Sequence, residues 1–193
     1  MAKISSGVNF TSDYFLGNFY TYNRDASKKT NRGNFKNAEL SFEDSRALTR
    51  ATKRLKRNDY STNINSDDDS DDISESIKSS IEAFATTYNN MIDSGKSSDD
   101  DDMKRYMRQL KTLTKNYSDD LDDIGITIES DGKLTVNSEL LSMADNDSVS
   151  KLFSADSEYL KKSARLAARL NNAAYNDICT QISTKNLHIN ITI

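Results

Sequence analysis

Two segments of the chain repeat apolar residues at alternating spacings of three and four. This spacing places the apolar side chains of residues 73–92, and again those of residues 102–121, in one narrow stripe on a helix. The first stripe contains Ile73, Ile77, Ile81, Phe84, Tyr88 and Met91. The second contains Met103, Tyr106 or Met107, Leu110, Leu113, Tyr117 and Leu121. Because only a short polar stretch separates the segments, the pattern predicts two antiparallel helices packed seam to seam.

A third long helix is predicted from Ser157 to Ile182, with Ser154 or Asp156 as its N-cap. Its apolar seam contains Leu160, Ala164, Ala167, Ala174, Ile178 and Ile182, and the adjoining flank contains Leu166, Leu170 and Ala173. Asn171 is a polar residue within this seam and leaves two interpretations open. It could fix the register of an oligomer, as buried polar residues do in coiled coils, or the seam could pack within one subunit.

The composition agrees with narrow seams rather than with a thick core. Only 35% of the residues are hydrophobic and 29% are charged, while proline is absent and glycine occurs 6 times, so little interrupts a helix. The predicted fold is therefore mainly α. We expect an elongated antiparallel helical bundle or coiled-coil leg, with one small β-hairpin and a possible C-terminal strand.

The hairpin is predicted over residues 124–136. Apolar and polar residues alternate in 124–128 and again in 133–136, and Asp131-Gly132 between them readily adopts the positive φ of a tight turn. Asn137 or Ser138 can then cap a short helix on its C-terminal side. This unit therefore reverses the chain between two long helices.

The remaining segments differ in composition. Residues 1–40 are predicted to form a polar, partly disordered arm, residues 41–58 a basic amphipathic helix, and residues 59–72 an acidic linker. Residues 73–182 are predicted to form the helical leg domain. The last segment, 183–193, alternates throughout and reads as a strand that needs an edge to pair with.

Basic residues gather in the first third of the chain. Residues 1–60 contain twelve Lys/Arg and six Asp/Glu, whereas the remainder is acidic. The helix that Ser41 is predicted to cap carries one basic face, formed by Arg46, Arg50, Lys53 and Arg57. Such a face could bind phosphates or an acidic protein, although a solvated face is the commoner explanation, and nucleic acid is the less favoured partner.

The acidic runs do not have the pattern of a metal site. Asp67, Asp69 and Asp71 alternate as in a calcium-binding EF-hand loop. That loop requires glycine at its sixth position and glutamate at its twelfth, which are here Asp72 and Lys78. We therefore expect no metal ligands.

The sequence likewise gives no positive indication of an enzyme. Cys179 is the sole cysteine and His188 the sole histidine, and neither belongs to a recognisable catalytic arrangement. We expect no catalytic residue, no cofactor and no membrane span. The first residues lack the apolar core of a secretory signal, so the chain is expected either to stay in the cytoplasm or to leave the cell without a cleaved signal.

Several short motifs resemble one family. Residues 81–92, IEAFATTYNNMI, resemble the "FV-x-x-YN-x-L/I" segment of the bacterial flagellar filament cap protein, hook-associated protein two. Residues 121–126 and Asp131-Gly132-Lys133-Leu134 are similar to its "L-x-x-IGI…DGxL" pattern, and residues 146–153 are similar to the next segment of the family. The resemblance covers roughly residues 73–182, in the order of the family.

This resemblance implies a shortened relative of the cap that retains its C-terminal leg. It implies a structural or assembly protein of the flagellum, exported without a cleaved signal through the type III apparatus, that self-associates or binds flagellin, hook-associated subunits or an export chaperone. The helical seams would then mediate interaction, through Ile77, Ile81, Phe84, Tyr88, Leu110, Leu113, Leu160, Leu166, Leu170 and Ile178. The alternative is a small cytosolic nucleic-acid-binding or regulatory module that uses the basic helix.

Overall fold

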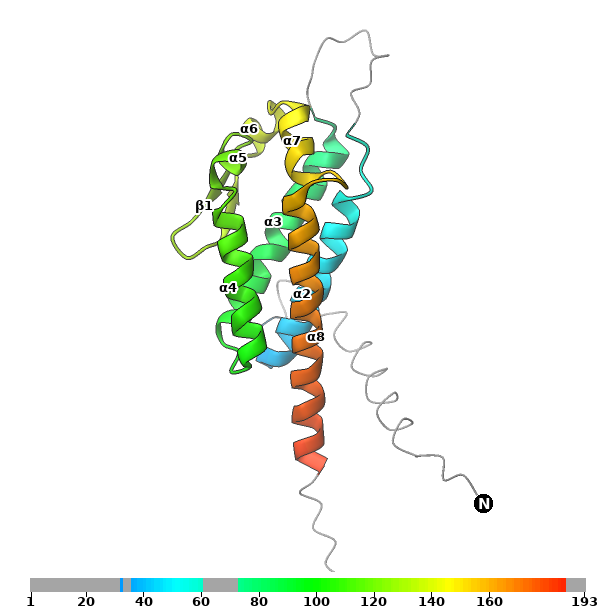
Figure 1. Ribbon diagram of the computed structural model, residues 1–193, viewed down its shortest axis with the longest axis vertical. Helices are drawn as coiled ribbons and strands as arrows, with labels where there is room; N and C mark the ends of the chain where they lie inside the picture. Colours follow the sequence, from blue (N-terminus) through cyan, green and yellow to red (C-terminus); the bar gives the residue numbers. More distant parts are fainter. Residues whose placement is uncertain (1–31, 33–35, 61–72, 187–193) are drawn as a thin grey trace, which may run out of the picture.

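Four long helices dominate the described part of the chain. The computed structural model describes residue 32, residues 36–60 and residues 73–186, with side chains described as far as Gln181. The helices run alternately up and down the molecule (Figure 1). Their bounds are α2 (Asn37–Leu55), α3 (Glu75–Lys96), α4 (Asp101–Lys115) and α8 (Glu158–Asn186). We call these four helices the shaft, and their arrangement confirms the predicted mainly α, antiparallel bundle.

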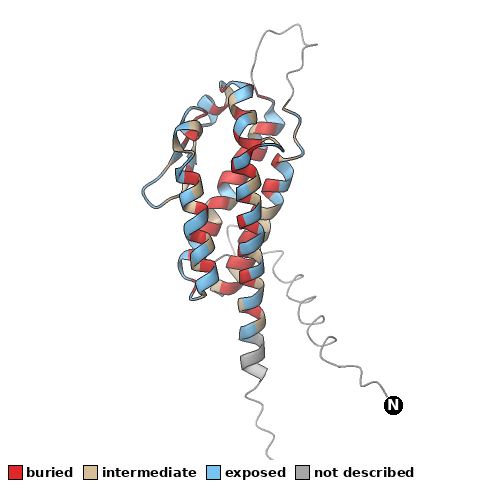
Figure 2. Ribbon diagram, viewed as in Figure 1, coloured by how far each residue is buried: buried red, intermediate tan, exposed pale blue. Residues whose placement is uncertain are grey.

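The shaft encloses one core to which all four helices contribute. Helix α2 packs extensively against both α8 and α3, and α4 packs against α8. The buried faces of the helices are directed toward one another (Figure 2). Phe84 of α3 lies at the centre of an aromatic cluster, with its ring centroid 5.7 Å from that of Phe153 and 6.3 Å from that of Tyr159, both edge-on. Edge-to-face contacts of this kind add to the free energy that the rings gain from burial.

The basic helix is part of this core and begins earlier than the sequence indicated. The N-cap of α2 is Lys36, whose backbone N–H donates to the Glu39 carboxylate at 3.1 Å, so residues 37–40 belong to the helix and not to the arm. Ser41, the predicted cap, is buried in the helix and donates to the carbonyl oxygen of Ser94 on α3 at 3.1 Å. The position that resembled a cap is therefore a helix–helix contact.

Three other boundaries differ from the sequence prediction. Helix α3 continues through Gly95, where a Cβ would lie 2.9 Å from the Met107 sulfur, so this glycine permits close approach of α4 instead of ending the helix. Helix α4 ends at Lys115, and a separate short helix comes after it. Helix α8 begins after Ser157, whose hydroxyl accepts from the Leu160 N–H at 3.2 Å, so the cap is neither Ser154 nor Asp156.

The C-terminal prediction is corrected in part. Residues 183–186 belong to α8 and are helical, not strand-like. The rest of the predicted strand, together with His188, lies outside the described residues, as does most of the N-terminal arm and of the acidic linker. Among the described residues, no helix is long and apolar enough to span a membrane.

Residues 118–153 form the end unit, which closes one end of the shaft (Figure 1). Its elements are α5 (Ser118–Asp122), β1 (Ile126–Ile128), β2 (Leu134–Val136), α6 (Ser138–Ser142) and α7 (Asn146–Phe153). The two strands pair antiparallel, with Ile126 opposite Val136, which confirms the predicted hairpin. Gly132 has a φ of 88° in the turn, as predicted. Asn137 caps α6 by accepting from the N–H groups of Glu139 and Leu140, both at 3.1 Å.

Candidate interaction surfaces

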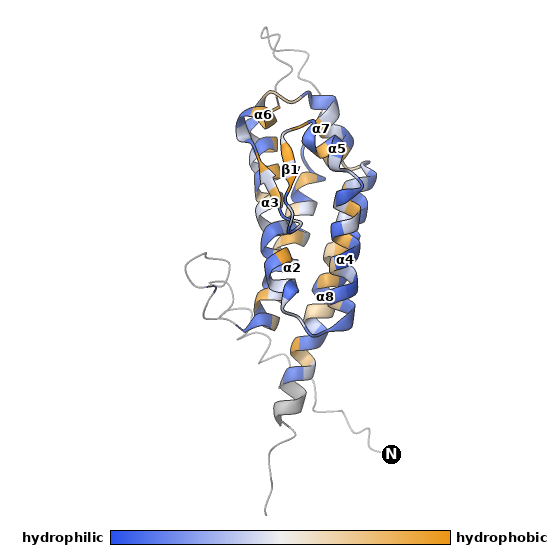
Figure 3. Cartoon of the chain, turned by 90° about the vertical axis from the view of Figure 1, so that its left-hand side faces the viewer, coloured by the Kyte–Doolittle hydropathy of each residue, from blue (hydrophilic) through white to orange (hydrophobic). Residues whose placement is uncertain are grey.

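The residues predicted to mediate interaction lie mostly inside the molecule. Nine of the ten seam residues are buried in the core that the four helices share: Ile77, Ile81, Phe84, Tyr88, Leu110, Leu160, Leu166, Leu170 and Ile178. Leu113 is partly buried and packs against the same core. Hydrophobic residues are frequent on α3 and β1, whereas α4 carries mostly hydrophilic residues (Figure 3). In this structure the seams pack on one another within one chain.

Asn171 also finds its partners within the chain. Its side-chain amide donates to the Ser45 hydroxyl at 3.2 Å and to the Phe42 carbonyl oxygen at 3.4 Å, both on α2. A polar group that is partly buried between helices favours the register in which its hydrogen bonds are made. Of the two interpretations that the sequence left open, the structure shows the packing of α8 on α2 in one subunit.

The two motifs that carry the family resemblance meet in space. The Asn89 amide of α3 donates to the Leu134 carbonyl oxygen at 2.7 Å and accepts from the Leu134 N–H at 2.7 Å. These two bonds satisfy the outer edge of β2 in the way that a neighbouring strand would. The Tyr88-Asn89 motif and the Asp-Gly-x-Leu motif therefore contact each other directly, and this contact attaches the hairpin to α3.

The basic row on α2 is the first candidate surface. Arg46, Arg50, Lys53 and Arg57 follow one line along this helix and its C-terminal turn; the last three are exposed and Arg46 is half-buried. Arg46 lies 3.6 Å from the Glu43 carboxylate. Burial raises the pKa of Glu43, although Arg46 and Arg50 oppose that shift. The row thus presents three exposed cationic side chains to solvent.

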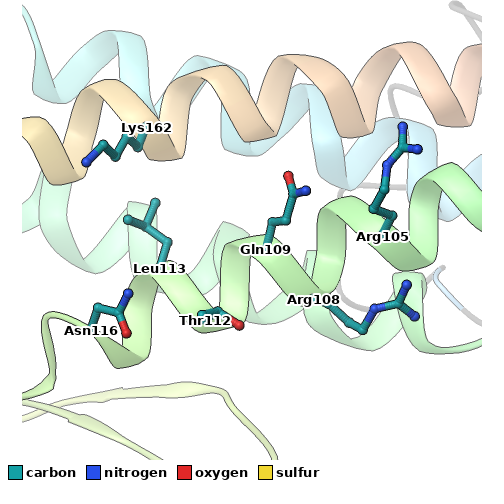
Figure 4. Close-up of a pocket in the computed structure, with 7 residues that line it drawn as sticks. All are labelled: Arg105, Arg108, Gln109, Thr112, Leu113, Asn116 and Lys162. Atoms are coloured by element: carbon teal, nitrogen blue, oxygen red, sulfur yellow. The ribbon is translucent and has the colours of Figure 1, made fainter.

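A second basic surface, which the sequence interpretation missed, lies between α4 and α8. An open groove of about 490 Å³ is lined by Arg105, Arg108, Gln109, Thr112, Leu113, Asn116 and Lys162. Arg105, Gln109 and Leu113 point from α4 toward α8, and Lys162 reaches back from α8 (Figure 4). The lining contains three cations and no carboxylate. We call it the α4–α8 groove.

The cations of this groove differ in how far they are neutralised. Arg105 contacts the Asp102 carboxylate at 2.9 Å and donates to the Tyr106 hydroxyl at 2.9 Å, and Lys162 lies 3.6 Å from Glu158. These are exposed pairs, which contribute little to stability and are readily exchanged for another anion. Arg108 is exposed and forms no ion pair with any described residue. The groove is therefore a region of positive potential that is open to a ligand.

The sequence contains a weak signal for this groove. Arg105, Arg108, Thr112 and Asn116 recur at helical spacing beside the apolar seam of α4, and such a polar stripe is ordinarily a solvated face. The partner residue, Lys162, is 46 positions beyond Asn116 in the sequence. Only the packing of α4 against α8 brings Lys162 to the same groove.

Potential metal ligands, Cys179 and two buried tyrosines are the remaining groups of chemical interest among the described residues. No group of three or more potential metal ligands occurs among them. Cys179 is half-buried and lies on α8. The hydroxyls of Thr114 and Tyr159 are 3.4 Å apart within the core. Burial raises the pKa of Tyr88 to about 12 and also raises that of Tyr159, so both phenols remain protonated at neutral pH.

Comparison with known proteins adds no relative. No family model, no curated protein and no solved structure matches the chain. Function is therefore inferred from the surfaces described above and from the motif resemblance in the sequence.

Proposed function

We propose that this protein is a structural or assembly protein of the bacterial flagellum, similar in design to the leg of the filament cap. It acts through helix-mediated self-association or through binding of a partner, and it is not an enzyme. The reciprocal hydrogen bonds between Asn89 and Leu134 support this proposal best, because they join the two resembling motifs into one folded unit. Residues that match a family pattern and also depend on each other in space are better evidence than either motif alone.

The burial of the apolar seams indicates which surfaces can bind a partner. Side chains such as Leu166 and Leu170 are inside the subunit, so they contact a partner only if the bundle opens. Partner binding is therefore assigned to exposed polar faces, of which α2 and the α4–α8 groove are the two basic ones. Flagellin, hook-associated subunits and an export chaperone are the proposed partners, and the flagellum or the medium is the proposed location.

Export provides the direct test of this function. The full chain carrying a small epitope tag is expressed in a flagellated host and in an isogenic strain that lacks the flagellar export ATPase. We expect the tagged chain in the culture medium of the first strain alone, as measured by immunoblotting with a cytosolic marker as control. Equal amounts in both media, or retention in both cell pellets, would count against the proposal.

Deletion of the gene provides a second readout in the native organism. We expect shorter or fewer filaments by electron microscopy and a smaller swimming radius on soft agar, with both restored by the wild-type gene. The matched comparison is complementation with an Asn89→Ala variant, which breaks the contact on which the proposal rests. Normal filaments in the deletion strain would contradict a role in assembly.

One observation favours a second candidate function, a small cytosolic nucleic-acid-binding or regulatory module. Arg50, Lys53 and Arg57 are exposed in one row along α2 and the turn after it, and such cations bind phosphates. Electrophoretic mobility shifts with DNA and RNA at low salt test it. Binding that weakens steeply with salt and is lost in Arg50→Glu/Lys53→Glu would support this candidate, whereas no shift at low salt would remove it.

A further inference from the structure

The charges of this molecule are segregated between its end and its shaft. The end unit, residues 118–153, contains nine Asp/Glu and two Lys/Arg. Helix α4 contains five Lys/Arg and two Asp, and the first half of α8, residues 158–172, contains four Lys/Arg and one Glu. A net charge of −4 thus conceals an anionic end beside a cationic groove.

Several carboxylates of the end unit are free to meet a partner. Asp120 is paired with Lys151, and Asp131 with Lys96 and Lys133. Asp123 and Glu139 are exposed, and neither side chain forms an ion pair or hydrogen bond with any described residue, although Asp123 contributes to raising the pKa of the nearby Lys151. Asp123 is the C-cap of α5 and Glu139 lies in α6. The Asn137 N–H donates to the Gly125 carbonyl oxygen at 2.8 Å, which brings the segments that follow α5 and precede α6 together at this end of the molecule.

The same end carries the large exposed apolar side chains of the described chain. Leu140 is 53% exposed and Met143 is 77% exposed, and both lie on or beside α6. The α4–α8 groove offers a matching apolar element, because Leu113 lies between its cations and is only partly buried. The end unit and the groove therefore match each other in charge and in apolar contact.

The end unit of a molecule cannot fill the groove of that same molecule. The end unit is directly continuous with α4, and the Asn89 and Lys111 hydrogen bonds hold its hairpin against α3 and α4. The hairpin reaches α4 at Lys111, three residues from Arg108, but the Asp131 carboxylate at its tip is already paired with Lys96 and Lys133. Arg105 and Arg108 thus remain available to another molecule.

We infer that the α4–α8 groove binds the acidic end unit of a second copy of this chain, with Asp123 and Glu139 of one copy facing Arg108 and Lys162 of the other. This contact gives a weak, salt-sensitive self-association. The inference deepens the proposed function and rests on it, because it names the partner and the surface of the self-association proposed above. The buried seams take no part in it.

The test is sedimentation velocity of the full chain at several concentrations, in about 50 mM and about 500 mM salt, across which the Debye length falls several-fold. We expect the weight-average sedimentation coefficient of the wild type to rise with concentration at low salt only. Arg108→Glu/Lys162→Glu and Asp123→Lys/Glu139→Lys should each weaken association at least tenfold. Arg50→Glu/Lys53→Glu has an equal charge change on α2 and should associate like the wild type.

Mixing the two charge-reversed proteins gives the sharpest outcome. The groove variant carries glutamates at the two contact positions of its groove and keeps the wild-type end, whereas the end variant keeps the wild-type groove and carries lysines at the two contact positions of its end. Each should be monomeric alone, whereas an equimolar mixture should associate, because both contacts become complementary again. Association of the wild type without recovery in the mixture would overturn the inference.

Other outcomes would overturn the inferred self-association or separate it from the proposed function. A wild type that remains monomeric at low salt overturns the inference, and it does so even if a variant misfolds, since this measurement uses the wild type alone. A monomer that instead binds DNA or RNA through Arg108 and Lys162 assigns the groove to another partner and also overturns it. If the chain is monomeric but still exported, the result contradicts this inference and leaves the proposed function standing. If the chain associates but is not exported, the result contradicts only the proposed function.

Discussion

The shaft and the end unit of this molecule share one hydrophobic core but differ in how far hydrogen bonds fix their position. The shaft buries continuous apolar seams, and its largest side chains, such as Phe84 and Tyr159, are fully buried. The end unit has short elements, and although Ile124, Leu141 and Phe153 anchor it in the same core, hydrogen bonds fix its hairpin and turns: Asn89 to Leu134, Lys111 to the Asp131 carbonyl oxygen, and Asn137 to α6. We therefore expect that removal of a hydrogen-bonding side chain destabilises the end unit more than the shaft.

The largest expected effect is the loss of an aromatic ring from the shaft. Phe84→Ala removes the ring that contacts both Phe153 and Tyr159, and should lower the free energy of unfolding by about 3–5 kcal/mol, as large-to-small changes in cores do. Urea denaturation monitored by circular dichroism measures it. Met143→Ala in the end unit, where the side chain is 77% exposed, is the control and should change stability by less than about 0.5 kcal/mol.

The next effect tests the backbone of the end unit. Gly125 has a φ of 78°, and a Cβ there would lie 2.6 Å from the Cβ of Leu140. Gly125→Ala combines backbone strain with a steric clash and should cost about 3 kcal/mol. Gly132 has a φ of 88°, but a Cβ there would meet only the flexible Lys111 side chain, at 3.2 Å.

Gly132→Ala is therefore the matched control and should cost about 1–2 kcal/mol, from backbone strain alone. Thermal unfolding of both variants tests whether Gly125→Ala loses more stability than Gly132→Ala. Equal losses would mean that packing of α6 over Gly125 contributes nothing. No loss in either variant would mean that the turns of the end unit are wrong.

Removal of the Asn89 amide should have a smaller effect, confined to the end unit. Asn89→Ala leaves the Leu134 N–H and carbonyl oxygen without their partner, which typically costs about 1–3 kcal/mol. Hydrogen exchange should become faster in 126–136 while α2 and α8 remain protected. Asn90→Ala, the adjacent asparagine, has no such contact and should behave as the wild type. A uniform loss of protection would show that the shaft and end unit unfold together.

The sequence was sufficient to predict some features because these depend on local spacing. The three–four repeat of Ile77, Ile81 and Phe84 predicted a helix, and Asp131-Gly132 predicted the turn, since each involves residues near one another in the chain. The sequence did not predict that Ser41 contacts Ser94, that Asn171 bonds to α2, or that Lys162 joins the groove of α4. These features depend on packing between distant segments, and the helical period of one segment does not specify its neighbours.

The smallest expected effect is a pH dependence at the tip of the hairpin. A hydrogen bond from the Lys133 backbone N–H, together with attraction by the Lys133 and Lys96 ammonium groups, holds the pKa of Asp131 below its ordinary value of 3.8. The folded state thus favours the ionised form. The resulting stability is present above the ordinary pKa and is lost as the pH falls through the lowered one.

Titration of the Asp131 carboxyl resonance by NMR should therefore give a midpoint below 3.8, with the Gly132 amide shifting in parallel. Asp131→Asn retains an acceptor for the Lys133 N–H but carries no charge, so it should abolish this titration while leaving the turn intact. Hydrogen exchange of the hairpin amides should become faster as the pH falls through this midpoint. A midpoint at or above the ordinary value would mean that the turn does not hold Asp131 against Lys133, and the contrast between a polar end unit and an apolar shaft would lose its clearest electrostatic support.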